Sequence, residues 1–205
     1  MTLAATRNHG FALAGGQALI AHGVVYRPTE DVDLFTDEED GVRAALQSAV
    51  DALRRAGFDV DEVPETSELG ELFEGFDSGL AELEVSRGRE TVRVQLAHFD
   101  RERRPVPMPV GPVLHIDDLV ATKVTALATR AYPRDFVDVA GLLQHYDRER
   151  LVALGRTADP GLGDDELAAA MRRLDRLDDA VFALYGLSPE KVAEVRSRFA
   201  DWPRR

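Results

Sequence analysis

Hydrophobic and polar residues follow two different periods along this chain. In roughly the first half, short segments alternate polar and apolar side chains, which is typical of half-buried strands. From Ile116 onward, apolar residues recur every three or four positions, which indicates amphipathic helices. The pattern predicts an α+β fold, with strands and helices in residues 1–112 and a helical region in residues 113–205 that packs on this core.

The first part is expected to hold several short elements separated by turn residues. Residues 3–13 read as a short helix or as the lead-in to a brief apolar strand at 11–14, and residues 64–70 read as a loop. Residues 80–85 and 91–96 alternate around Arg87-Gly88-Arg89, which predicts a hairpin. The remaining expected elements are strands at 31–35 and 58–63, helices at 17–22 and 40–56, and an extended segment at 101–112.

The second part is expected to be helical throughout. The first two helices are predicted at 117–131 and 134–145, separated by Pro133. The remainder, 147–205, is expected to form further helices that break near 159–161 and 188–189, where Pro and Gly interrupt the pattern.

The main chemical candidate lies in the stretch from Gly15 to Phe35. Gly15-Gly16 opens a short apolar segment, and a helix start with exposed N–H groups attracts phosphate. In the strand that follows, Asp31 and Asp33 lie on one face because successive side chains alternate. Two carboxylates this close favour a hard divalent ion between them, such as Mg²⁺ or Mn²⁺. The second copy of the spacing, Asp59-Val60-Asp61, follows no glycine pair and is expected at a solvated strand edge.

Lys123 is the second candidate because it interrupts the apolar stripe of the predicted helix 117–131. It either extends its ammonium to water or faces a cleft and contacts a triphosphate. Arg130 falls on the same side of the helix. Asp135 begins the next helix, where it either complements the helix dipole or fixes the position of Lys123 or Arg130.

The composition narrows the class of protein. With 44% hydrophobic and 30% charged residues, the chain is typical of a soluble globular protein. No apolar run approaches the roughly 20 residues of a membrane span, and the N-terminus lacks a signal-peptide pattern, so a cytoplasmic protein without membrane contact is expected. The absence of cysteine excludes disulfides and thiolate zinc sites.

The net charge of −12 argues against broad electrostatic binding to nucleic acid. A local basic groove remains open, because arginines cluster at 87–93 and at 101–104. Only Lys123 and Lys191 are lysines. The chain uses Arg wherever any cation would serve, so each of the two lysines is a candidate for a specific role. The clustered arginines are Arg87, Arg89, Arg93, Arg101, Arg103 and Arg104.

Four motifs in order resemble the AbiEii/AbiGii-type nucleotidyltransferases of the DNA polymerase β-like superfamily, many of which are toxins of toxin–antitoxin pairs. The motifs are Gly15-Gly16-Gln17-Ala18-Leu19, residues 27–35 (RPTEDVDLF), residues 118–123 (DLVATK) with Arg130, and residues 134–138 (RDFVD). This resemblance covers residues 11–145. It implies a nucleotidyltransferase-like mixed β-sheet, Mg²⁺ (or Mn²⁺) and a nucleoside triphosphate.

The resemblance also implies roles for individual residues. Asp31 and Asp33 would be catalytic and hold the metal, with Lys123 and Asp135 completing the site. The nucleotide would contact a further set of residues. These are Gly15, Gly16, Gln17, Arg27, Thr29, Lys123 and Arg130.

One position departs from the superfamily pattern. A third carboxylate usually stands on a neighbouring strand, and Gln95 occupies that place here, which leaves Gln95 or Asp100 as the third ligand. A neutral amide is a poor metal ligand and cannot act as a base.

Three interpretations follow. The first is an active enzyme that moves a nucleoside monophosphate to a hydroxyl of RNA or tRNA, a protein or a small molecule, as a toxin with an antitoxin partner. The second is a catalytically weakened nucleotide-binding module with a regulatory role. The third treats the motifs as coincidence in an acidic structural domain.

Overall fold

The structure is a computed structural model that describes residues 2–29, 31–63 and 79–205. The loop predicted at 64–70 lies outside the described residues. The chain divides into two compact units, which are described separately below. The first unit comprises Met1–Ala21 and Thr29–His115, and the second comprises His22–Pro28 and Ile116–Arg205.

The first unit is built on a mixed sheet, and the α+β expectation is confirmed. Among the described residues the sheet has seven strands in the order β3-β4-β5-β2-β1-β7-β6. The pairs β2–β5 and β1–β7 are parallel, and the others are antiparallel. The strands are β1 (Ala12–Leu13), β2 (Asp31–Thr36), β3 (Asp59–Val63), β4 (Leu80–Arg87), β5 (Glu90–His98), β6 (Val106–Met108) and β7 (Gly111–Val113).

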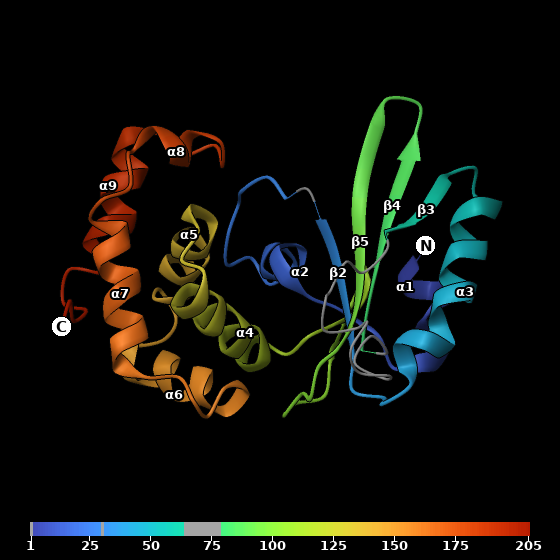
Figure 1. Cartoon of the computed structure of the whole chain (residues 1–205), viewed down its shortest axis with the longest axis horizontal. Helices are drawn as coiled ribbons and strands as arrows, with labels where there is room; N and C mark the ends of the chain where they lie inside the picture. The colour runs from blue at the N-terminus through green and yellow to red at the C-terminus, as the bar shows by residue number, and fades with distance from the viewer. Residues whose placement is uncertain (1, 30, 64–78) are drawn as a thin grey trace, which may run out of the picture. The chain divides into compact units, whose positions relative to one another are not determined.

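Helices lie on both faces of this sheet (Figure 1). The long helix α3 (Gly41–Arg55) and the short α1 (Thr2–Ala5) lie on one side, and α2 (Gly15–Ala21) lies on the other. A 3₁₀ turn, Arg7–His9, follows α1. The interpretations offered for residues 3–13 therefore both hold, since a short helix precedes the brief strand β1.

Alternation along the strands gives the sheet one apolar and one polar face. Val50 and Leu53 of α3 pack in a core cluster with side chains from three strands of the sheet. Asp31 and Asp33 lie at the alternate positions of β2, so they belong to the face opposite α3. The strand residues in the cluster are Val60, Leu83, Val85 and Val94.

The segment predicted to be extended, 101–112, contains two strands that its prolines did not indicate. It contains the hairpin β6–β7, and β7 joins the sheet beside β1 through the Leu13–Val113 pair. Leu114 then donates its N–H to the carbonyl of Leu13 at 2.9 Å. This pairing joins residues a hundred positions apart, so no local pattern marked the segment as part of the sheet.

The second unit is helical, as expected. Its helices are α4 (Ile116–Thr129), α5 (Pro133–Leu142), α6 (Arg148–Ala158), α7 (Asp164–Leu174), α8 (Ala180–Ala183) and α9 (Pro189–Ser197). The helix α4 packs against α5, α6 and α7, which explains why its apolar stripe is buried. Phe136, Phe199 and Trp202 add an aromatic core with ring centroids 5.7 and 5.3 Å apart.

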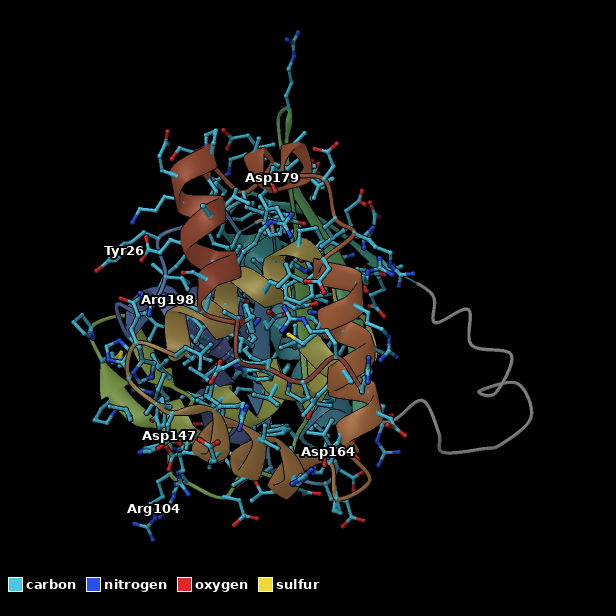
Figure 2. All side chains as sticks on the ribbon, turned by 90° about the vertical axis from the view of Figure 1, so that its left-hand side faces the viewer. Tyr26, Arg104, Asp147, Asp164, Asp179 and Arg198 are labelled. Atoms are coloured by element: carbon cyan, nitrogen blue, oxygen red, sulfur yellow. The ribbon has the colours of Figure 1, made fainter. Side chains whose placement is uncertain are left out.

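Acidic residues mark the helix starts of this unit, because a carboxylate stabilises the N-terminal N–H groups and the positive end of the helix dipole. Asp147 caps α6 by accepting the N–H of Arg150 at 2.7 Å. Asp164 is the first residue of α7, and Asp179 precedes α8 (Figure 2). Within the part of the chain that the structure describes, the helices are too short or too polar to traverse a bilayer.

Residues His22–Pro28 belong to the second unit although they lie between α2 and β2 in the sequence. Val24 and Val25 are buried, and they fit against α5 because Gly141 has no side chain. A Cβ on Gly141 would lie 2.8 Å from Val25 Cγ1 and 3.0 Å from the carbonyl of Val24. The division predicted at residue 112 stays a prediction, and no local pattern indicates that this inserted segment belongs to the second unit.

Candidate active site

The carboxylates of Asp31 and Asp33 lie on the polar face of β2, both half-buried. Their strand is paired on both sides, by β1 and by β5, so the backbone that carries them is fixed by two ladders. In the parallel ladder with β5, Asp31 lies beside Arg93 and Asp33 lies beside Gln95. The predicted spacing therefore places both carboxylates on one face of a central strand.

Gly15 makes room for the carboxylate of Asp33. A Cβ added to Gly15 would lie 1.6 Å from Asp33 Oδ2, which no side chain could occupy. Gly15 also has φ of 59°, in the left-handed region that glycine adopts without strain. The N–H of Ala14 donates to the carbonyl of Asp33 at 2.8 Å and holds the turn against β2. The glycine pair is therefore structurally tied to the acidic strand.

The other predicted residues of this unit also lie near the turn. Gly16 is buried in the first turn of α2. The side chain of Gln17 donates from Nε2 to the hydroxyl of Thr29, which joins α2 to the start of β2. Their contact with nucleotide stays a prediction.

The two candidates for a third ligand occupy different positions. Gln95 is half-buried and in register with Asp33, on the strand to which the family resemblance assigned it. Asp100 lies beyond the end of β5, its side chain is 95% exposed, and its Oδ1 lies 3.6 Å from Nε2 of His98. Of the two, Gln95 therefore occupies the position beside the acidic pair.

The residues present fit one divalent ion delivered with a substrate. Among the described residues no group of three or more His, Cys, Asp or Glu side chains could hold a metal. Mg²⁺ does not need such a cage, since it is commonly held by one or two carboxylates together with substrate phosphates. Asp31, Asp33 and the space that Gly15 leaves for Asp33 Oδ2 match that mode of binding.

The second unit contains a buried cluster of charges centred on Asp138. Its carboxylate is fully buried and accepts from Arg27 Nε at 2.7 Å and Nη2 at 2.8 Å. Lys123 Nζ lies 3.0 Å from the same carboxylate. Arg27 also donates from Nη1 to the carbonyl of Pro28 at 3.0 Å. Lys123 therefore does not extend into solvent, because its ammonium is held by Asp138.

The electrostatics of this cluster keep Asp138 ionised. Burial alone would raise the pKa of Asp138, but the charge of Lys123 and the hydrogen bonds and charge of Arg27 outweigh it and hold the pKa below its usual value. Burial would lower the pKa of Arg27, and Asp138 reverses that effect and raises it. Two cations on one carboxylate leave the cluster with a net positive charge.

Asp135 pairs with Arg130 rather than with Lys123. Its buried carboxylate accepts from Arg130 at 3.0 and 2.9 Å and from the N–H of Tyr132 at 2.9 Å. The hydrogen bond to Asp135 raises the pKa of Arg130, against the smaller opposing effect of burial. Asp135 therefore caps α5 and fixes a cation, which covers both roles weighed from the sequence. Direct contact of Arg130 with nucleotide stays a prediction.

Sequence reasoning did not select Asp138 as a site residue. Its signal was present, because Asp138 stands in an otherwise apolar run, between Phe136-Val137 and Val139-Ala140. A carboxylate in such a run must be paired to be buried. Its partner Arg27 lies 111 positions away, so the sequence could indicate the need for a cation but not its identity.

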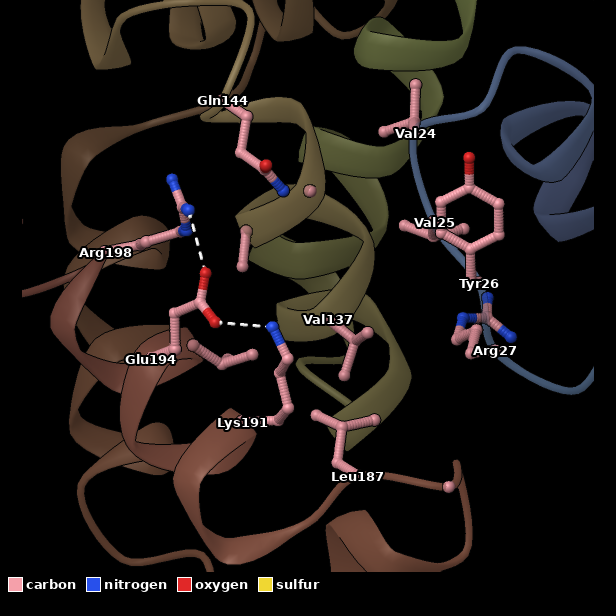
Figure 3. A pocket seen from close by; sticks show the side chains of 14 residues that line it. Val24, Val25, Tyr26, Arg27, Val137, Gln144, Leu187, Lys191, Glu194 and Arg198 are labelled. Carbon is pink, nitrogen blue, oxygen red and sulfur yellow. Dashed lines mark hydrogen bonds and ion pairs between the residues drawn. The ribbon is translucent and has the colours of Figure 1, made fainter.

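Arg27 also borders a pocket of about 300 Å³ within the second unit (Figure 3). Residues 24–27, α5 and α9 form its walls, and Val137, Gly141 and Val195 contribute apolar surface. Glu194 of α9 pairs with Lys191 at 2.9 Å and with Arg198, just after the helix, at 3.0 Å. Tyr26 stands at the edge of the pocket and is 89% exposed.

Three of the clustered arginines, Arg87, Arg93 and Arg101, each have a different local partner. Arg87 stacks on Phe58 at 3.9 Å, whereas Arg93 pairs with Glu82 at 3.3 Å. Arg101 pairs with Asp37 and donates to the carbonyl of Gly10. Arg87 and Arg93 lie on opposite faces of the sheet, because their side chains alternate along the hairpin. Arg93 and Arg101 are each paired with a carboxylate, so these three charges are separated from one another.

Comparison with known proteins gives a family match and two informative structural relatives. The family model "Nucleotidyl transferase AbiEii toxin, Type IV TA system" matches residues 3–184. JHP933 from Helicobacter pylori superposes with a TM-score of 0.57 at 16% identity, over 96% of this chain and 87% of that one. The nucleotidyltransferase toxin MenT4 (Rv2826c) from Mycobacterium tuberculosis H37Rv superposes with a TM-score of 0.58 at 19% identity, over 94% of this chain and 75% of that one. No curated protein matches the chain at a significant level.

Proposed function

We propose that this chain, which belongs to the AbiEii nucleotidyl transferase toxin family, moves a nucleoside monophosphate from a nucleoside triphosphate to a hydroxyl acceptor. The observation that carries the proposal is the Asp33 carboxylate seated against Gly15, with Asp31 on the same strand face. A phosphate-accepting turn and a metal-binding carboxylate pair are the two parts that such a reaction needs in one place.

In the proposed reaction the acceptor oxygen forms a bond to the α-phosphorus. The bond from that phosphorus to pyrophosphate breaks, pyrophosphate leaves with the electron pair, and the hydroxyl proton passes to solvent. Asp31 and Asp33 would hold Mg²⁺ or Mn²⁺, which supplies positive charge to the phosphate oxygens when bound. Gly15 leaves room for the Asp33 carboxylate, and the backbone N–H groups of Gly15 and Gly16 would contact the phosphates.

The family resemblance assigns contact with the triphosphate to Lys123, and this role is part of the proposal. Lys123 is a compact ammonium, and Asp138 leaves it with donors to spare, since one N–H of the three suffices for that carboxylate. Arg27 completes the charge balance of Asp138, so Lys123 need not neutralise it alone. Asp138 is thus proposed as a positioning residue for Lys123.

The acceptor, an antitoxin partner and a cytoplasmic location are part of the proposal. An RNA or tRNA end is one acceptor class and a protein or small-molecule hydroxyl is another. The strongly acidic chain and the divided arginine clusters favour a small contact area over extended backbone binding to nucleic acid.

Calorimetry with a nucleoside triphosphate tests the metal-dependent site. We expect binding with Mg²⁺ and little binding with chelator, because the two carboxylates repel a triphosphate without a bridging cation. Asp31→Asn and Asp33→Asn should each weaken binding by roughly tenfold or more, the loss expected when a charged partner is removed. Asp59→Asn and Asp61→Asn are matched controls, with the same spacing and on an edge strand of the same sheet. Equal affinity with and without metal would contradict the proposal.

Lys123→Met tests the proposed role of Lys123 by the same measurement. Nucleotide affinity should fall by roughly tenfold, while Asp138 keeps its two hydrogen bonds from Arg27 and the fold is retained. Incubation with labelled nucleoside triphosphates and total RNA, or with a cell extract free of RNA, then asks whether a labelled product forms and in which fraction.

A second function is favoured by one observation, the amide of Gln95 in register with Asp33. Without a third carboxylate the same site could bind nucleotide and transfer slowly, as a regulatory module. Metal-dependent binding with no transfer to any fraction would select this alternative over the enzyme.

A further inference from the structure

The pocket beside Arg27 is enclosed by two helices and one loop segment, all within the second unit (Figure 3). One wall comes from α5, another comes from α9 and the residue that follows it, and residues 24–27 form the third. On each helix the lining positions follow the spacing i, i+3, i+4 and i+7, which places them on one face of that helix. These positions are 137, 140, 141 and 144 on the first wall, and 191, 194, 195 and 198 on the second.

The walls of the pocket differ in chemistry. Val137 and Ala140 make the α5 wall apolar, and Val24 and Val25 continue this apolar surface on the loop segment. Ligand pockets typically combine such apolar walls with a small number of polar or charged groups. The pocket therefore suits a molecule with one apolar part and one charged part. The charged side chains of the α9 wall are Lys191, Glu194 and Arg198.

The α9 wall carries more positive than negative charge. Glu194 is paired through both of its oxygens, because its Oε2 lies 2.9 Å from Lys191 Nζ and its Oε1 lies 3.0 Å from Arg198 Nη2 (Figure 3). Among the described residues that line the pocket, Glu194 is the one carboxylate. Two cations on one carboxylate leave a surplus positive charge, in a chain whose net charge is −12. This local charge attracts an anion although the chain as a whole is acidic.

The α9 wall, and not Arg27, is the part of the pocket that can receive an anion. Arg27 donates two hydrogen bonds to Asp138, and its side chain is only 6% exposed. The side chain of Lys191 is 69% exposed and that of Arg198 is 27% exposed. An ammonium has three N–H donors, and one suffices for a single carboxylate oxygen. Lys191 therefore keeps donors for a further anion, and Arg198 adds a second cation.

We propose that this pocket binds a small molecule that carries one carboxylate on a short apolar body. The apolar body would lie against α5 and the valines at 24–25, and the carboxylate would pair with Lys191 and Arg198. These two cations already hold the two oxygens of one carboxylate in Glu194, so their separation matches that group. A volume of about 300 Å³ lies at the lower end of the range for ligand pockets, which favours a short body. This inference goes beyond the proposed transfer reaction, because it assigns a second ligand to the chain.

Four probes separate the two parts of the ligand. Octanoate carries both parts, octanamide and octylamine keep the apolar body with a neutral or a positive head group, and acetate keeps only the carboxylate. Octanoate should bind at millimolar concentration. Octanamide should bind roughly three- to tenfold more weakly, because it lacks the ion pairs with the α9 wall. Calorimetry measures both affinities.

Methyl NMR of protein labelled at valine locates the bound probe. Octanoate should shift the methyl signals of the four valines that line the pocket, whereas octylamine and acetate should leave these signals unchanged. The four are Val24, Val25, Val137 and Val195.

Two variants of the α9 wall should change octanoate affinity in opposite directions. Lys191→Gln removes a cation and should weaken octanoate by roughly two- to fivefold. Glu194→Gln removes the carboxylate that competes for the same cations, and it should strengthen octanoate by roughly two- to fivefold. Neither variant should change the affinity for octanamide, which carries no charge.

Glu149→Gln is the matched control, because Glu149 is an exposed carboxylate that pairs with Arg148 and does not line this pocket. It changes the net charge by the same amount as Glu194→Gln and should leave octanoate affinity within about twofold of wild type. Circular dichroism checks the folding of each variant.

The outcomes also distinguish this pocket from the proposed nucleotide site. Octanoate affinity should be the same with and without saturating ATP and Mg²⁺, and displacement by the nucleotide would overturn the inference, because the pocket would then belong to the nucleotide site. Equal affinity for octanoate and octanamide would show that the α9 wall does not recognise the charge. The inference is likewise overturned if Lys191→Gln and Glu194→Gln move octanoate affinity in the same direction, or if octanoate shifts none of the four valine signals.

Discussion

Asp138 is the residue whose replacement should cost the second unit most. Asp138→Asn would leave the buried cations Arg27 and Lys123 without a counter-charge, which typically costs about 3–5 kcal/mol. Urea unfolding at neutral pH measures the loss. Asp175→Asn is the control, since it removes an exposed pair with Arg204 and should cost at most about 1 kcal/mol. Similar losses in both variants would contradict a special role for Asp138.

The same carboxylate gives this contribution a pH dependence. The pKa of Asp138 is lower in the folded protein, because the charges of Lys123 and Arg27 outweigh the effect of burial. Its contribution is therefore present above the unfolded pKa of about 3.9 and is lost as the pH falls through the folded pKa. The difference in unfolding free energy between wild type and Asp138→Asn should accordingly shrink below about pH 4.

Among the elements, the turn from β1 into α2 is the one that shapes the proposed site. Gly15→Ala should displace Asp33, because the new Cβ would lie 1.6 Å from Oδ2, and Mn²⁺ affinity should fall by roughly tenfold or more. Gly57→Ala is the matched control. It also has positive φ, at 81°, but its Cβ would meet nothing within 4 Å.

Both variants carry the cost of a left-handed residue, about 1–2 kcal/mol. Only Gly15→Ala should also lose metal binding. If Gly57→Ala weakens Mn²⁺ to the same degree, the effect comes from global destabilisation and the close packing of Gly15 on Asp33 is not responsible.

At the scale of the whole chain, we expect the second unit to need the inserted segment His22–Pro28 in order to fold. A fragment of residues 116–205 lacks Arg27 and the valines that pack at Gly141. It should show little near-ultraviolet circular dichroism from Trp202 and a broad unfolding transition. Added peptide 22–28 should restore part of that signal. A fragment that unfolds cooperatively without the peptide would show that the segment is dispensable.

The sequence determined much of this protein through short-range physics. Period-2 and period-3.6 patterns located β2, the β4–β5 hairpin, α3, α4 and α5, because each depends on the alternation of buried and exposed side chains within a few residues. The ordered motifs predicted the nucleotidyltransferase family, which the family match over residues 3–184 confirmed. Alternation likewise placed Asp31 and Asp33 together on one face.

Only the tertiary structure decided which distant residues meet. Asp138 rather than Asp135 holds Lys123, Arg27 crosses 111 positions to reach it, and β7 pairs with β1. The register of β2 with β5 brings Arg93 beside Asp31. Local propensity carries no information on such pairs, because a buried charge specifies that it needs a partner but not where along the chain the partner lies.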